Sequence, residues 1–115
     1  MEENIILTKT YNFALRIINL YKYLCDEKKE YTLSKQILRS GTSIGANSEE
    51  ASGSISKKEF RAKYSISYKE ARETHYWIRL LKDSEYIEAK LANSLLNDVE
   101  EILKILGAIL KTVSK

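Results

Sequence analysis

A chain of 115 residues with no proline and only four glycines has room for one domain of long helices joined by short turns. Its hydrophobic content of 43% and charged content of 30% are typical of a soluble helical protein, and no apolar run approaches the roughly 18 residues needed to cross a bilayer. Residues 1–4 are acidic and lack the basic and then apolar layout of a signal peptide, so we expect a cytoplasmic protein without membrane contact.

The first helix is predicted over residues 8–28, with Thr8 or Thr10 as its capping residue. Two apolar rows run along it: Phe13, Ile17, Leu20 and Leu24 in one, and Tyr11, Ala14, Leu15, Ile18, Tyr21 and Cys25 in the other. Cys25 is the single cysteine of the chain, so it can form neither an internal disulfide nor a Cys-based metal site. Its apolar position predicts a buried core thiol.

A second helix, rich in small residues, is predicted over residues 33–54. Glycine inside a helix costs roughly 1 kcal/mol relative to alanine, so Gly41 and Gly45, one turn apart, indicate the close approach of a neighbouring helix. A phosphate-binding loop is excluded, because it needs a Gly-Lys-Ser/Thr ending after a strand. Asn47 and Glu50 share one face, and we expect them to form interhelical hydrogen bonds or caps that determine the register.

A third helix begins at a capping box, Ser56 with Glu59, and ends near Lys82. Its core row follows a 4-3-4-3 spacing: Phe60, Tyr64, Ser67, Ala71, Thr74, Ile78 and Leu81. Residues 56–82 carry eight lysines and arginines against three glutamates, a net charge of +5. The two preceding segments are neutral and the segment after it carries −2, so the net positive charge of the chain lies on this helix.

The two flanks of this core row differ in charge. One is basic with aromatic insertions: Arg61, Ser65, Tyr68, Arg72, His75, Arg79 and Lys82. The other is largely acidic and apolar: Glu59, Lys63, Ile66, Glu70, Glu73, Trp77 and Leu80. The basic flank could follow a phosphate backbone, with Tyr68 and His75 stacking on exposed bases. Alternatively, the opposite charges could pair between subunits of a ring, or the face could simply be solvated.

A turn at residues 83–86 precedes a fourth helix over 88–113, whose apolar stripe is Leu91, Leu95, Val99, Ile102, Leu106, Ile109 and Val113. Four amphipathic helices with short connections predict an all-α, up-down-up-down four-helix bundle, one domain over residues 1–115. The apolar faces of the first and fourth helices are wider than one seam requires. We therefore expect a homo-oligomer.

The chain has few groups suited to catalysis. His75 is the lone histidine, and no local pattern pairs it with Cys25 or a serine as a nucleophile. A di-iron bundle site needs Glu-x-x-His pairs on two helices, whereas Arg72 stands three residues before His75. We expect no enzyme activity, no catalytic residue, no metal and no cofactor.

Four motifs together resemble a known family: RSGTSIGAN at 39–47, EA at 50–51, SKKEF at 56–60 and SYKEARETHYWIRLL at 67–81. They are similar to the small bacterial four-helix bundle proteins encoded in intervening sequences of 23S ribosomal RNA genes. The accessory protein of diversity-generating retroelements is a relative. By motif match, Asn47, Glu50, Ala51 and Phe60 fall on recurrent structural positions of that family. Ser48 and Glu49 depart from its usual pattern of an aliphatic and then a basic or small residue.

This resemblance implies a homopentameric ring and, as in the retroelement relative, a basic surface that binds nucleic acid and a reverse transcriptase. We therefore expect a non-enzymatic scaffold that binds RNA or DNA through the third helix. The residues expected to bind are Lys57, Lys58, Arg61, Tyr68, Arg72, His75, Arg79 and Lys82. Those with a structural role are Gly41, Gly45, Asn47, Glu50 and Phe60. The alternative is a protein–protein adaptor or structural oligomer whose basic row pairs with acidic flanks of neighbouring subunits.

Overall fold

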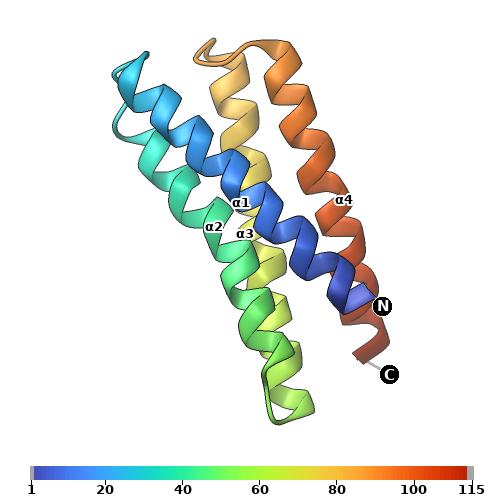
Figure 1. Cartoon of the computed structure of the whole chain (residues 1–115). Helices are drawn as coiled ribbons and strands as arrows, with labels where there is room; N and C mark the ends of the chain where they lie inside the picture. The colour runs from blue at the N-terminus through green and yellow to red at the C-terminus, as the bar shows by residue number, and fades with distance from the viewer. Residues whose placement is uncertain (1, 114–115) are drawn as a thin grey trace.

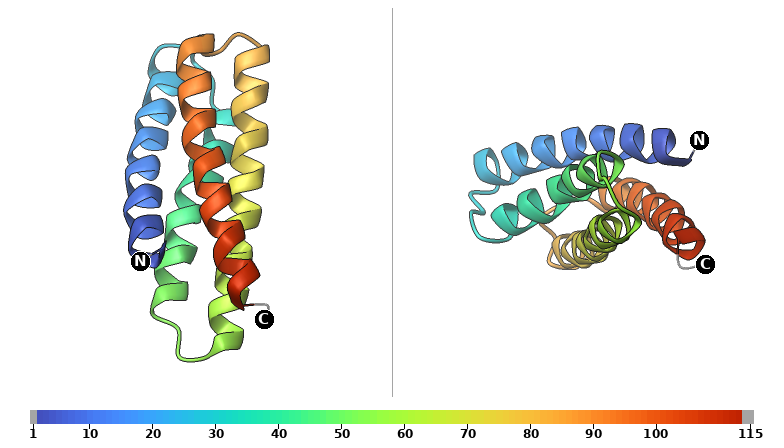
Figure 2. Two further views of the ribbon diagram at one scale, coloured as in Figure 1. Left: turned by 90° about the vertical axis from the view of Figure 1, so that its right-hand side faces the viewer. Right: turned by 90° about the horizontal axis from the view of Figure 1, so that it is seen from below.

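A computed structural model describes residues 2–113, with side chains from residue 4 onward (Figure 1). This part of the chain forms four helices and no strand: α1 (Glu2–Asp26), α2 (Leu33–Ser52), α3 (Lys57–Asp83) and α4 (Ala89–Val113). Successive helices run antiparallel around one core, so the predicted all-α four-helix fold is confirmed (Figures 1 and 2). The α2–α3 end projects beyond the described ends of α1 and α4, and the molecule measures 45 × 20 × 18 Å.

The first helix begins at Glu2 rather than at residue 8, and the capping role predicted for Thr8 or Thr10 is wrong. Thr10 lies inside α1, where its buried hydroxyl donates to the Ile6 carbonyl at 2.7 Å. Because the threonine bonds back one turn, it causes no break in the helix. Ile6 is fully buried, so the apolar face of α1 extends toward the N-terminus beyond the predicted start.

The start of α2 is capped by Glu30, which the sequence analysis did not single out. Its carboxylate accepts hydrogen bonds from the backbone N–H groups of Thr32 (3.2 Å), Leu33 (2.9 Å) and Ser34 (2.7 Å). Burial opposes ionisation of this carboxyl, but the three N–H donors outweigh it and hold the pKa of Glu30 below its usual range. The cap satisfies donors that the first turn of a helix otherwise leaves unpaired.

The two glycines of α2 lie against α1. A Cβ added at Gly41 would stand 2.8 Å from both Cγ atoms of Ile17, and one at Gly45 would stand 3.3 Å from the Thr10 hydroxyl. The close approach expected at these glycines is therefore present, and the neighbouring helix is α1. Cys25 lies at the end of the same contact, half-buried rather than fully buried, with its sulfur 3.7 Å from the Ser34 hydroxyl.

Small buried hydroxyls join α2 to α3. Ser67 donates to the Ile44 carbonyl at 2.8 Å and lies 2.9 Å from the Ser48 hydroxyl, while Thr74 donates to Ser40 at 2.8 Å. These residues are fully buried, so each polar atom needs the partner that it has here. The bonds determine the rotation of α3 against α2, and this rotation decides which flank of α3 faces α4.

The core side of α4 differs from its prediction at one end. Leu91 is 37% exposed, whereas Ala92 one position later is fully buried. The rest of the predicted stripe is buried as far as Ile109. α4 meets α1 less extensively than it meets α3, because α1 and α4 diverge away from the chain termini (Figure 1).

Candidate nucleic-acid interface

The third helix begins as predicted and lies between α2 and α4. The Ser56 hydroxyl accepts a hydrogen bond from the Glu59 backbone N–H at 3.1 Å. Every member of the predicted core row is buried except Phe60, which is half-buried and packs edge to face on Tyr64 with ring centroids 4.8 Å apart. With the core row in place, the two charged flanks of α3 lie toward different neighbours.

The acidic flank of α3 faces α2, where its carboxylates pair with an arginine. Arg39 of α2 pairs with Glu70 at 3.2 Å and also with Glu73. Glu73 in addition accepts a hydrogen bond from the Trp77 indole at 2.9 Å. One guanidinium thus binds two carboxylates and compensates half of their negative charge.

Of the two polar α2 residues expected to connect helices, only one does so. Glu50 pairs with Lys63 of α3 at 2.8 Å, and this hydrogen bond and charge raise the pKa of Lys63. Asn47 instead donates to the Ser43 carbonyl at 2.9 Å within its own helix. Its amide reaches the preceding turn of α2 and does not bridge to another helix, so the role predicted for it is corrected.

Three members of the predicted basic row lie in the seam between α3 and α4. The Tyr68 ring covers Gly107, where an added Cβ would stand 3.9 Å from Cε1 of the ring. His75 Nε2 is 2.9 Å from Glu100 Oε2, and the Lys82 ammonium donates to Asn93 Oδ1 at 3.0 Å. The rings of Tyr68 and His75 are thus half-buried against α4 and do not lie on the open surface where a base could stack on them.

The other predicted basic residues are exposed: Lys57, Lys58, Arg61, Arg72 and Arg79. Lys57 and Lys58 lie at the projecting α2–α3 end (Figure 1). Within the described part of the chain, neither Arg72 nor Arg79 forms an ion pair. The Arg79 guanidinium lies 5.8 Å from the centre of the Tyr76 ring, a cation–π contact that leaves its charge uncompensated.

The fourth helix adds two cations that the sequence analysis missed. Asn93, Glu100 and Gly107 all meet the basic row of α3, and this spacing of seven defines the face of α4 that points to it. Lys104 and Lys111 lie one turn beyond Glu100 and Gly107 on that face, and both are exposed. The spacing of these residues in the sequence shows that they share one face of α4, but only the packing of α4 shows that this face meets α3. We call this surface the basic face, and its cations are Arg61, Arg72, Arg79, Lys82, Lys104 and Lys111.

A hollow of about 630 Å³ opens on the basic face. Its lining residues are Arg72, Glu73, His75, Tyr76, Arg79 and Leu103. Tyr76 is 48% exposed, which makes it an accessible aromatic ring among these cations. Tyr76 was absent from the predicted binding residues because it lies one position outside the basic row.

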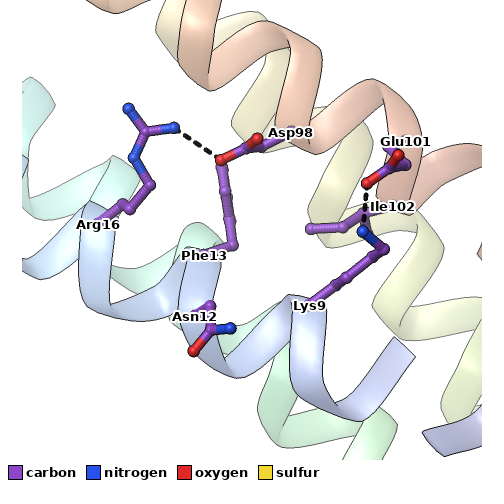
Figure 3. Close-up of a pocket in the computed structure, with 7 residues that line it drawn as sticks. All are labelled: Lys9, Asn12, Phe13, Arg16, Asp98, Glu101 and Ile102. Atoms are coloured by element: carbon purple, nitrogen blue, oxygen red, sulfur yellow. Dashed lines mark hydrogen bonds and ion pairs between the residues drawn. The ribbon is translucent and has the colours of Figure 1, made fainter. Parts of the chain in front are cut away.

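A smaller hollow of about 230 Å³ lies between α1 and α4 (Figure 3). Two ion pairs cross it, Lys9 with Glu101 at 2.5 Å and Arg16 with Asp98 at 2.6 Å. Both cations that line this hollow are therefore neutralised, in contrast to those on the basic face. The two ion pairs join α1 to α4, the neighbouring helices with the least extensive contact in the bundle.

No three His, Cys, Asp or Glu side chains within the described part of the chain gather where they could hold a metal ion. None of the four described helices is both long enough and apolar enough to span a bilayer.

The sequence matches the model of the 23S rRNA-intervening sequence protein family over residues 2–108. The chain belongs to this family. The family resemblance inferred from the motifs is thereby confirmed, and the match covers the whole basic face except Lys111. A similar fold is found in the crystal structure of a protein with unknown function from the S23 ribosomal protein family of Bacteroides thetaiotaomicron. The two sequences are 50% identical, the TM-score is 0.95, and the alignment covers 96% of this chain and 99% of that one. No curated protein matches.

Membership of the 23S rRNA-intervening sequence protein family assigns the fold without naming a reaction or a ligand. The similar Bacteroides structure carries no assigned function either. The side chains of the basic face are therefore what can indicate a function for this chain.

Proposed function

We propose that this member of the family is a non-enzymatic, ring-forming scaffold that binds RNA or DNA through its basic face. The observation that carries the proposal is the separation of charge on α3. Arg39 holds the acidic flank of the helix, whereas Arg72 and Arg79 on the other flank are exposed and form no ion pair within the described residues. Lys104 and Lys111 continue the positive surface onto α4.

The length of the basic face suits a polyanion better than a small ligand. At about 1.5 Å per residue, the distance along α3 from Arg61 to Lys82 is roughly 30 Å. Several cations spread over such a length can each neutralise a phosphate and release its counterions, which makes binding strong at low salt and steeply salt-dependent. Phosphate contacts of this kind carry no sequence preference of their own.

Self-association is supported by apolar side chains left on the outer side of α1. Tyr11 is 63% exposed and Leu15 is 47% exposed, and with the half-buried Ile18 they follow the i, i+4, i+7 spacing of one helix stripe. We call these three residues the α1 stripe. A stripe of this kind is a suitable subunit contact, and the number five for the ring comes from the family resemblance. A ring would repeat the basic face around one assembly and so multiply its charge.

The adaptor alternative requires the acidic flank of one subunit to pair with the basic face of the next. Glu70 and Glu73 already bind Arg39 within the chain, so fewer carboxylates are available for that pairing. We therefore favour nucleic acid as the ligand of the basic face.

The test is fluorescence anisotropy with a structured RNA and a single-stranded DNA, at low and at near-physiological salt. We expect binding that weakens steeply as salt rises, and loss of binding in the double variant Arg72→Glu/Arg79→Glu. The matched control reverses two exposed lysines elsewhere, Lys22→Glu/Lys35→Glu, and should bind nearly as the parent protein does. Light scattering would follow assembly in all three proteins.

No binding of either nucleic acid at low salt would refute the proposal. If the arginine variant also lost its assembly, the basic face would be assigned to subunit pairing and the adaptor alternative would replace the scaffold. Equal losses in the arginine and lysine variants would show that only total charge matters, and the basic face would lose its role.

A further inference from the structure

Tyr76 is the accessible aromatic side chain of the hollow on the basic face, and its surroundings orient its ring. The Trp77 ring packs against it edge to face, with centroids 5.2 Å apart and planes at 63°. Trp77 is itself held through the hydrogen bond from its indole to Glu73, whose carboxylate pairs with Arg39. A surface tyrosine supported in this way is partly pre-ordered for stacking, which lowers the entropy cost of binding.

Two guanidinium groups that form no ion pair within the described residues flank this ring along the helix, and that of Arg79 already lies over it, 5.8 Å from its centre. Arg72 precedes Tyr76 by four residues and Arg79 follows it by three, so each lies about one turn away, roughly 6 Å and 4.5 Å along the axis. Leu103 of α4 supplies an apolar contact on the far side of the hollow, and His75 is held at its edge by Glu100. The hollow thus has an aromatic surface in the middle and a cation on either side of it, and the one carboxylate in its lining, Glu73, is paired with Arg39.

We propose that this hollow is the subsite for one unpaired base of a single-stranded nucleic acid, with the base stacked on Tyr76 and its two flanking phosphates on Arg72 and Arg79. This inference rests on the proposed function and adds the class of nucleic acid. A base within a duplex is already stacked and paired, so its face cannot reach the ring, whereas a base in a single strand can turn out onto it. Because every base has such a face, the subsite takes single strands with little sequence preference.

The test compares fluorescein-labelled dT20 with a dT20·dA20 duplex, using the full chain and its Tyr76→Ala and Tyr76→Phe variants. Stacking on one aromatic ring contributes enough that Tyr76→Ala should weaken dT20 binding by about five- to 150-fold. Tyr76→Phe keeps the ring and should bind dT20 within about twofold of the parent protein. The duplex should bind equally to all three. Tyr31→Ala, which removes a tyrosine that is 54% exposed outside the basic face, is the matched control and should change nothing.

Trp77 provides a second readout, because it is the one tryptophan of the chain and its ring contacts Tyr76. Saturating dT20 should change the tryptophan emission of the parent protein, and saturating duplex should leave it unchanged. Melting curves of the variants should overlay the parent curve, since Tyr76 lies at the surface.

The outcomes separate this subsite from the proposed function. The subsite is refuted if Tyr76→Ala binds dT20 as tightly as the parent does, or if the variant weakens binding of the duplex as much as binding of dT20. In either case salt-dependent binding through the arginines stands. An unchanged tryptophan emission on saturation with dT20 would also overturn the stacked base. If the parent protein binds neither DNA at low salt, the proposed function fails and the subsite with it.

Discussion

Substituting Gly41 by alanine tests the closest helix contact of the bundle. The new Cβ would lie 2.8 Å from both Cγ atoms of Ile17, a separation that real Cβ atoms do not adopt, so α1 or its side chain must shift. Overpacking of this kind costs about 1–3 kcal/mol. Replacing glycine by alanine inside a helix stabilises by about 1 kcal/mol, which offsets part of the cost. We expect a net loss of about 0–2 kcal/mol in the free energy of unfolding.

Gly107→Ala is the matched control, since Gly107 also lies inside a helix but has room for a methyl group. Its added Cβ would meet Tyr68 at 3.9 Å, an ordinary van der Waals distance. The helix gain of about 1 kcal/mol should then appear alone, and the protein should become more stable. Because that gain is common to both variants, their difference isolates the overpacking at Gly41, about 1–3 kcal/mol.

Urea unfolding followed by circular dichroism measures these differences, and each kcal/mol should move the melting temperature by about 3–6 °C in a chain of this length. A double-mutant cycle with Ile17→Ala identifies the clash itself, because that change removes both Cγ atoms. Alone, Ile17→Ala should lower the free energy of unfolding by about 2–5 kcal/mol. The double variant should lose about 1–3 kcal/mol less than the sum of the losses of the two single variants. Gly41→Ala at least as stable as Gly107→Ala, or strict additivity in the cycle, would show that the contact is not tight and refute the reasoning.

Three further changes test other parts of the structure. Glu30→Gln removes the charged cap of α2 and should cost about 1 kcal/mol at pH 7. The pKa of Glu30 is lowered in the folded protein, so the stability that its carboxylate contributes is complete above the unfolded pKa near 4.5 and is lost as the pH falls through the folded pKa. Urea titrations at pH 7 and pH 3 should therefore show the stabilities of the variant and the parent converging in acid. A difference that stays constant with pH would contradict the cap. Glu85→Gly should stabilise the protein by about 1 kcal/mol and so raise its melting temperature by a few degrees. The reason is that Glu85 has φ 65° at the end of α3, a conformation that glycine adopts without steric cost. An unchanged melting temperature would show that this position is unstrained. Leu15→Glu on the α1 stripe should reduce the mass measured by light scattering to that of the monomer with helix content unchanged, and an unaltered mass would place the subunit contact elsewhere.

The helices themselves could be predicted because their evidence is local. The helical period of α3 predicts its core row, and Ser56 predicts the cap at its start. Gly41 and Gly45 predict the close contact of α2 with a neighbouring helix. Each of these patterns involves residues within a few turns of one another. The predicted start of α1 was wrong because the extension depends on the burial of Ile6 in the common core, which only the tertiary structure shows. The Glu30 cap of α2 is a local interaction that the prediction overlooked, since the carboxylate lies two to four residues before the N–H groups that it binds.

Only the tertiary structure decided which neighbouring helix each flank of α3 meets and which of its side chains stay exposed. A helical period gives the angles of side chains around their own axis, but it does not say which neighbour stands at each angle. The rotation of α3 between α2 and α4 pairs its acidic flank with Arg39, turns Tyr68 and His75 into a seam, and leaves Tyr76 exposed. The sequence by itself determined four amphipathic helices and a charged third one. Packing determined which charges stay unpaired, because ion pairing depends on distances between helices that no single helix encodes.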